Sequence, residues 1–215
     1  MIYLRAGLYA EGRSDYAFLC RLLDRHLDAL AAPMFAGDCE VADTVGIDAP
    51  EPAAGMRRAD RIAAAVAESS ESCTLFVIHS DGASDPEGAR ATCVEPGITA
   101  ARAALPEMEI VAVACVPVRE IEAWLLTDPE AFRRLFGSSF EPALPAEPEK
   151  ELDPKATLRK ILKDGGFRRS VDPVHALFSE SVRFATLRAL PAFRVFEADL
   201  IEAIKRVAWS QGHRG

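Results

Sequence analysis

Three short apolar stretches decide the fold: IYLRAGLYA at residues 2–10, TLFVIH at residues 74–79 and EIVAVACV at residues 109–116. Such β-branched and apolar runs are typical of strands that are buried on both faces of a sheet. Segments with apolar residues at helical spacing alternate with these strands, at residues 14–31, 57–68 and 98–105. This alternation predicts βαβ units and therefore a parallel sheet covered by helices on both faces.

The rest of the chain completes this plan. We expect a short strand near residues 41–47, a polar loop at 80–96, and helices at 120–126 and 129–136. Residues 1–136 then form a Rossmann-like α/β core. Residues 137–153, rich in Pro and Glu, form a linker or exposed loop. Residues 154–215 form a mostly helical C-terminal region that packs on the core, with helices at 154–163, at 173–188, either continuous or broken, and at 192–208.

The composition is that of an ordinary globular protein. Apolar residues make up 49% and charged residues 27% of the 215 residues, which excludes a disordered chain, a collagen and a coiled coil. No apolar run approaches the ~20 residues that span a bilayer, so we expect no membrane segment. The first residues lack the basic and apolar regions of a signal peptide, so we expect a cytoplasmic protein.

Charge is unevenly distributed along the chain. Residues 1–100 contain 8 basic and 16 acidic residues, and residues 101–215 contain 17 of each. Residues 155–194 contain nine basic and three acidic residues, a net charge of +6. Such a segment is either a set of solvated helix faces or a surface that grips a polyanion such as nucleic acid.

Carboxylates follow each of the three predicted strands. Glu11 follows the first, Asp81 and Asp85 follow the second, and Glu120 and Glu122 follow the third. Because ligands of parallel sheets bind beyond the carboxyl ends of the strands, we expect these groups to lie near one another. Clustered carboxylates repel one another, and a divalent cation with a preference for oxygen, Mg²⁺ or Mn²⁺, removes that cost. Taken singly, each of them is better explained as a turn former or a solvated residue of a first helical turn, and only their coincidence at three successive strand ends supports a metal site.

Other polar residues beside these carboxylates are candidates for binding substrate. Gly12 permits a sharp bend behind Glu11. The basic side chains suit phosphate oxygens, whereas a histidine at a strand end also suits a structural hydrogen bond. These candidate residues are Gly12, Arg13, His79, Arg119 and Lys155.

Several of these motifs resemble the Toprim group, the metal-dependent fold of topoisomerases, primases and overcoming-lysogenization-defect nucleases. The segment LYAEGRSD at residues 8–15 resembles its first motif, a glutamate and glycine after the first strand. The segment FVIHSD at 76–81 reaches the first aspartate of its Asp-x-Asp motif. More closely, VPVREIEAWLLTD at 116–128, followed by Asp153-Pro154-Lys155, is similar to the Toprim-like family called domain of unknown function 4276.

The resemblance implies a fold and an activity. It implies a Toprim core over about residues 1–160, with Glu11 as acid/base or metal ligand and with Asp81 and Asp85 on Mg²⁺. It implies a nuclease or phosphodiesterase acting on nucleic acid, and also a partner ATPase in bacterial phage defence. One departure is Ala83, which stands where the second aspartate of Asp-x-Asp belongs. Either Asp85 or the glutamates at 120 and 122 would then complete the site.

The departure leaves a second hypothesis open. A catalytically degenerate Toprim-like module would bind a partner ATPase or a nucleotide without cleaving nucleic acid. A phosphohydrolase of the haloacid dehalogenase type is a weaker alternative, because its Asp-x-Asp nucleophile motif does not follow the first strand here. The sequence predicts no particular oligomeric state.

Overall fold

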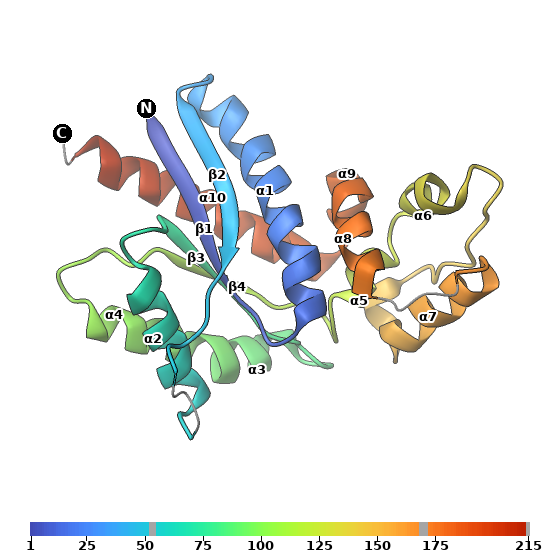
Figure 1. Ribbon diagram of the computed structural model, residues 1–215, viewed down its shortest axis with the longest axis horizontal. Helices are drawn as coiled ribbons and strands as arrows, with labels where there is room; N and C mark the ends of the chain where they lie inside the picture. Colours follow the sequence, from blue (N-terminus) through green and yellow to red (C-terminus); the bar gives the residue numbers. More distant parts are fainter. Residues whose placement is uncertain (52–54, 168–171, 214–215) are drawn as a thin grey trace.

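The structure, a computed structural model, describes residues 1–51, 55–167 and 172–213. At its centre is a parallel sheet with the strand order β2-β1-β3-β4, and helices lie against both faces (Figure 1). The strands are β1 (Ile2–Tyr9), β2 (Cys39–Gly46), β3 (Leu75–His79) and β4 (Ala112–Cys115). The predicted α/β class is therefore confirmed.

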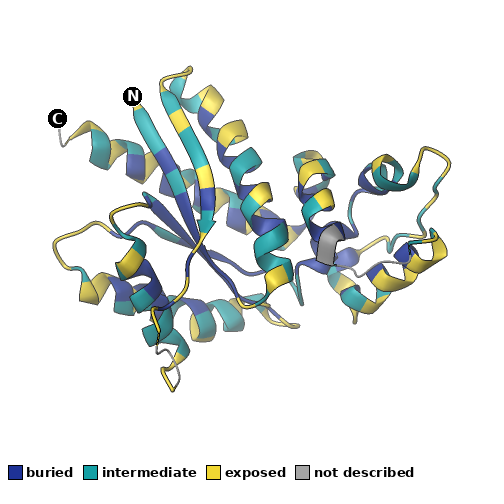
Figure 2. Cartoon of the chain, in the orientation of Figure 1, coloured by how far each residue is buried: buried dark blue, intermediate teal, exposed yellow. Residues whose placement is uncertain are grey.

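Alternate residues of the strands point to opposite faces of the sheet and build two hydrophobic clusters. Leu4, Leu8 and Val77 pack against α1 (Arg13–Phe35) and α10 (Pro191–Gly212) on one face. Phe76 and Ile78 pack against α2 (Arg58–Ser69) and α4 (Glu95–Ala104) on the other. Since both faces are covered, β3 is buried over its whole length, and Figure 2 shows this in dark blue.

The strand order reverses its direction between β1 and β3. The chain leaves β1 through α1 toward β2, whereas it leaves β3 through α4 toward β4, in the opposite direction. The two connections therefore diverge above the carboxyl ends of β1 and β3. In open α/β sheets, this reversal point is where ligands bind.

A group of short helices lies beyond this end of the sheet, at the right of Figure 1. Its members are α5 (Glu122–Leu125), α6 (Pro129–Phe136), η2 (Pro148–Lys150), α7 (Pro154–Asp164), α8 (Asp172–Ser181) and α9 (Phe184–Leu187). Helix α8 packs along α1, where the Arg25 guanidinium donates to the carbonyls of Ser179 and Val182. These helices and α10 share the hydrophobic cluster of α1, so the C-terminal region packs directly on the α/β core.

The expectation of a polar loop over residues 80–96 is wrong in its second half. The chain there forms α3 (Pro86–Ala89) and a π-helical turn, η1 (Arg90–Val94), that continues into α4. The Asp85 side chain starts α3 by accepting a hydrogen bond from the Gly88 N–H at 2.9 Å. Proline at the first helical position after such a cap is a standard helix start.

Other boundaries move by a few residues. Helix α1 continues past Pro33 to Phe35, and β4 covers only half of the apolar stretch at 109–116. The helix expected at 173–188 is divided into α8 and α9. None of the helices within the described ranges is both long and apolar enough to cross a bilayer.

Candidate functional site

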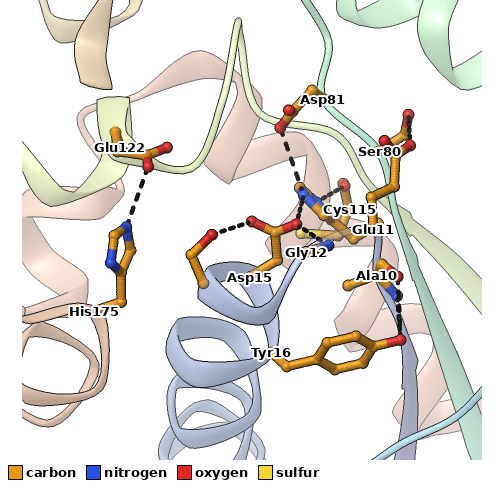
Figure 3. Close-up of polar contacts among 12 residues, drawn as sticks. Ala10, Glu11, Gly12, Asp15, Tyr16, Ser80, Asp81, Cys115, Glu122 and His175 are labelled. Atoms are coloured by element: carbon orange, nitrogen blue, oxygen red, sulfur yellow. Dashed lines mark hydrogen bonds and ion pairs between the residues drawn. The ribbon is translucent and has the colours of Figure 1, made fainter. Parts of the chain in front are cut away.

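The turn after β1 carries Glu11 and is fixed from two sides. The Tyr16 hydroxyl accepts the Ala10 N–H and shares its one hydrogen between the carbonyls of Ala10, at 3.1 Å, and Ile47, at 3.0 Å. The Gly12 N–H donates to Oδ2 of Asp15 at 2.9 Å, which closes the first turn of α1. Glu11 therefore stands on a rigid turn with its side chain 51% exposed, at the reversal point of the sheet (Figure 3).

Arg58, the first residue of α2, neutralises Glu11. Its Nη1 lies 2.5 Å from Oε1 of Glu11, and the Ser80 hydroxyl lies 3.5 Å from the same oxygen. The guanidinium also donates to the carbonyls of His79, at 2.8 Å, and Cys93, at 2.9 Å. Arg58 thus connects the ends of β1 and β3 with the π-helical turn.

His79 ends β3 and lies beneath the site with only 1% of its side chain exposed. Its Nδ1 lies 3.0 Å from the carbonyl of Cys115, and because a carbonyl only accepts, Nδ1 carries the hydrogen. Its Nε2 is buried and has no hydrogen-bond partner, but faces Asp15 at 3.8 Å and Asp81 at 3.6 Å. Burial alone lowers the pKa of His79, and the contacts with Asp81 and the Cys115 carbonyl outweigh it and raise the pKa to about 10.

Asp15 and Asp81 come from different elements and meet at this ring nitrogen (Figure 3). Asp15 is the third residue of α1 and is largely buried, whereas the Asp81 side chain is 52% exposed. Burial raises the pKa of Asp15, attraction to His79 lowers it in part, and repulsion from Asp81 and Glu122 raises it further. The carboxylates of three separate segments therefore act on one another here.

Glu122 and Glu120 flank this group on the side of the short helices. Glu122 is 2% exposed; its Oε1 lies 3.2 Å from Nε2 of His175 and 3.6 Å from Nζ of Lys155. Burial raises the pKa of Glu122, but the contacts with His175 and Lys155 reverse the shift and lower it. Glu120 accepts the backbone N–H of Lys155 at the start of α7, and burial together with repulsion from Glu122 raises its pKa.

The loops after β3 and β4 are joined through their backbones. Ala83 and Arg119 exchange two hydrogen bonds, of 3.3 and 2.6 Å, and both have positive φ angles, 45° and 62°. The Gly82 N–H donates to the Pro117 carbonyl, and a Cβ at Gly82 would lie 2.3 Å from that oxygen. Glycine is therefore required at this close approach.

The remaining predicted residues lie at the edge of the site. Arg13 is exposed at the first position of α1, beside Gly12. Lys155 directs its ammonium group toward Glu122, and Arg119 buries its Nε without a hydrogen-bond partner. The carboxylate of Asp85 caps α3. An aspartate that caps a helix and an aspartate that binds a metal ion have the same sequence pattern, so the sequence alone does not distinguish these two roles for Asp85.

The structure adds three residues that the sequence did not single out: Asp15, Arg58 and His175. Asp15 could have been found from the local sequence, since an acidic residue at the third position of a helix often accepts the N–H of the residue that precedes the helix. Arg58 and His175 carry none, because each reaches the site only through the packing of a whole helix, α2 on α4 and α8 on α1.

The chemistry of these side chains suits a divalent metal ion, but each carboxylate already has a cationic neighbour from the chain. Glu11 has Arg58, Asp15 and Asp81 have His79, and Glu122 has His175 and Lys155. Within the described ranges, no three histidine, cysteine, aspartate or glutamate side chains are arranged to hold a metal ion as they stand. The Nε2 of His79 is buried without a hydrogen bond, and its ion-pair distances to Asp15 and Asp81 fit a protonated ring rather than a metal ligand.

Comparison of the chain with family models, with curated proteins and with solved structures finds no match. The relationship to the Toprim-like family therefore stays a prediction from the motifs in the sequence. What is shown is the fold: a Rossmann-like α/β core whose reversal point carries acidic, basic and histidine side chains.

Proposed function

We propose that the chain is a Toprim-like, Mg²⁺-dependent phosphodiesterase that cleaves nucleic acid, in the cytoplasm and in the context of bacterial phage defence. The observation that carries the proposal is the mutual repulsion of Asp15, Asp81, Glu120 and Glu122 at the reversal point of the sheet, with Glu11 on the turn after β1 beside Ser80. This is the place where parallel α/β sheets bind their ligands.

The roles of the residues follow from their positions. When bound, Mg²⁺ would polarise the phosphate and lower the pKa of an attacking water. Asp81 and Asp15 are the carboxylates placed to hold it. Glu11, half-exposed on its rigid turn, is placed to take a proton from the attacking water or to orient it. Arg58 keeps the Glu11 carboxylate in one position.

Basic side chains near the carboxylates would bind the phosphate backbone. Arg13 is exposed at the start of α1, and Arg159 and Lys163 are exposed on α7. Lys155 is partly exposed and lies 3.6 Å from Glu122. Two arginines of the predicted basic segment form ion pairs within the chain, Arg183 with Asp128 and Arg188 with Glu197, so we do not assign them to phosphate binding. Arg168 and Arg169 of that segment lie outside the described residues. We therefore assign phosphate binding to α7 and the start of α1.

A cleavage assay with matched variants tests this proposal. The full chain is incubated with end-labelled single- and double-stranded DNA and RNA, with Mg²⁺ or with a chelator. We expect Mg²⁺-dependent cleavage that Glu11→Gln and Asp81→Asn each reduce at least 100-fold. Asp85→Asn is the control, because the Asp85 carboxylate is engaged in capping α3 and asparagine caps a helix about as well as aspartate. Equal losses in all three variants, or cleavage that survives chelation, would contradict the proposal.

A second function is favoured by two specific observations. Ala83 replaces the second aspartate of the Toprim pattern, and each main carboxylate is neutralised within the chain. We propose as the alternative a non-cleaving module that binds a nucleotide or a partner ATPase. Thermal unfolding with ATP, ADP or AMP distinguishes it, because a ligand that binds only the folded chain raises the melting temperature. Such a rise, with no cleavage of any substrate, would favour the module.

A further inference from the structure

The two edges of the sheet differ in how they are protected against pairing with another strand. Strand β2 forms one edge and exposes Glu40 and Asp43, whose charges disfavour the addition of a strand. Strand β4 forms the other edge and contains alanine, valine and cysteine alone. The edge at β4 therefore lacks the charged side chains with which soluble proteins commonly block an edge strand.

The backbone of β4 and of the residues after it is paired on one side. The carbonyls of Cys115 and Pro117 accept N–H groups from the chain that follows β3, at 3.2 and 3.0 Å. Because the backbone groups of successive strand residues point to opposite sides, those of Ala114 and Val116 point away from β3. Within the described ranges, the N–H and carbonyl groups of Val116 and Val118 form no hydrogen bond. An added strand would find its donors and acceptors there.

A groove with a volume of about 360 Å³ lies along this unpaired side of β4. One wall is formed by α3 with the π-helical turn, and the other wall is the start of α10. The apolar residues that line the groove include Ala114, Val116, Val118, Pro86, Val195 and Phe196. Because the side chains of a strand alternate between its two faces, those of an added strand would contact both walls.

An ion pair joins the two walls and limits the groove at one end. The Arg90 guanidinium, on the π-helical turn, contacts Asp199 of α10 at 2.6 Å and Glu95 at 3.0 Å. Helix α10 begins at the groove and ends beside the start of β1, where Gln211 bonds to Tyr3. The ion pair therefore lies toward the start of β4, and the groove beside the end of β4 stays open.

The groove also carries a negative charge that the chain does not neutralise. Glu87 lines the groove and is exposed, and its side chain forms no ion pair within the described ranges. The one guanidinium nearby, that of Arg90, already contacts the carboxylates of Glu95 and Asp199. A basic side chain on a bound segment would therefore complement Glu87.

We propose that this groove binds an extended segment of a partner protein, which adds as a strand to the unpaired edge of β4. The segment has apolar side chains at alternate positions and a basic residue at one end. In this mode of recognition, main-chain hydrogen bonds supply affinity and side-chain pockets supply specificity. A second copy of the chain does not fit as the occupant, because its sheet edge would bring its own helices against both walls. The inference goes beyond the proposed function and does not depend on it.

Binding of a defined peptide to the full chain tests the inference. The probe is a fluorescein-labelled peptide in which a lysine precedes alternating valine and threonine, and fluorescence anisotropy measures its binding. Two further peptides carry N-methyl groups on alternate amides, in one or the other of the two possible registers. Because an added strand directs every second N–H toward β4, we expect the two methylated peptides to differ at least tenfold in affinity. Equal affinities of the three peptides, or no binding at millimolar peptide, would overturn the inference.

Matched variants locate the binding surface. Val195→Arg places a charged side chain in the groove at a position that is 56% exposed, so we expect at least a tenfold loss of affinity without unfolding. Ala198→Arg is the control, because Ala198 is exposed on α10 outside the groove. Glu87→Gln should weaken binding of the lysine peptide but not of a peptide with threonine in place of lysine. Equal effects of the two arginine variants would contradict binding in the groove.

Sedimentation of the wild-type chain tests a second copy as the occupant. We expect a monomer at micromolar concentrations of the chain. A dimer that Val195→Arg dissociates and Ala198→Arg does not would assign the groove to a second copy and overturn the inference.

Discussion

Ala83 and Arg119 form a backbone pair although both have left-handed backbone conformations, with φ angles of 45° and 62°. The pair joins the loop after β3 to the loop after β4, just beside Asp81. Such conformations cost roughly 1–2 kcal/mol for residues with a Cβ atom. They persist where the surrounding structure holds them, and they are concentrated at functional sites.

Ala83→Gly should stabilise the chain. Glycine adopts a positive φ without steric cost, and this gain outweighs its greater freedom in the unfolded chain, so we expect an increase of up to about 1 kcal/mol in the free energy of unfolding. Urea unfolding measures it. Ala198→Gly, at an exposed position inside α10, is the control and should destabilise by about 1 kcal/mol. A loss of stability in Ala83→Gly would show that the backbone there is not strained.

Arg183→Met should destabilise the packing of α6 against the chain between α8 and α9. Asp128 is fully buried and accepts hydrogen bonds from the Arg183 N–H, Nε and Nη2. Leaving such a carboxylate short of donors costs about 1–3 kcal/mol. Thermal unfolding should detect it, and Arg159→Met, at an exposed position on α7, should change little.

The same pair gives a pH dependence with a defined sign. Burial raises the pKa of Asp128, but the hydrogen bonds and charge of Arg183 outweigh it and hold the pKa below its ordinary value of 3.8. The wild type should therefore keep its advantage over Arg183→Met at pH values above about 4, and lose it as the pH falls through the lowered pKa. An advantage that stays constant down to pH 2 would contradict this assignment.

His26 should make the chain less stable in mild acid. Its ring is stacked between Phe184 and Phe193 and is fully buried, and burial lowers its pKa below 6.5 despite the hydrogen bond with Glu197. As the pH drops below about 6.5, His26 binds a proton in the unfolded chain more readily than in the folded chain. The free energy of unfolding therefore falls. His26→Leu should remove this part of the pH dependence between pH 7.5 and 5.5. An unchanged slope would rule His26 out.

Arg58→Gln should lower the free energy of unfolding, whereas the same substitution at the neighbouring Arg57 should not. The variant leaves the carbonyls of His79 and Cys93 without their charged donor, and we expect a loss of about 1–3 kcal/mol in urea unfolding. Arg57→Gln is the matched control, because Arg57 is exposed and pairs only with Asp60 among the described contacts. Equal effects would indicate that Arg58 does not hold the two strand ends together.

Local sequence patterns predict most of the sheet and fewer of the site residues. The runs that contain Leu75 and Val113 are strands because apolar side chains on both faces need helices above and below. His79 and Asp81 are predicted as site residues only because they stand at the carboxyl end of β3. Asp85 has the same residue type and the same loop, yet it caps a helix, and only the Asp-Pro pair that begins α3 indicates this.

The other site residues reach the site through contacts between elements that lie far apart in the sequence. His175 lies 53 residues after Glu122, and the two meet because α8 packs along α1. Arg58 reaches Glu11 because α2 crosses the sheet on the opposite face. Neither contact has a local signature, since a histidine or an arginine near a helix start has the same spacing whether it faces the site or solvent.

The return of α10 across the sheet determines when the chain can finish folding. Gln211 near its end exchanges hydrogen bonds with the backbone of Tyr3 in the first strand, at 2.9 and 2.8 Å. During synthesis, α1 is available early to cover its share of this face, whereas the part of β1, β3 and β4 that contacts α10 stays uncovered until residues 191–212 leave the ribosome. Nascent chains of this protein therefore expose this part of the strand surface until α10 has been made, and this is the stage at which a chaperone would engage them.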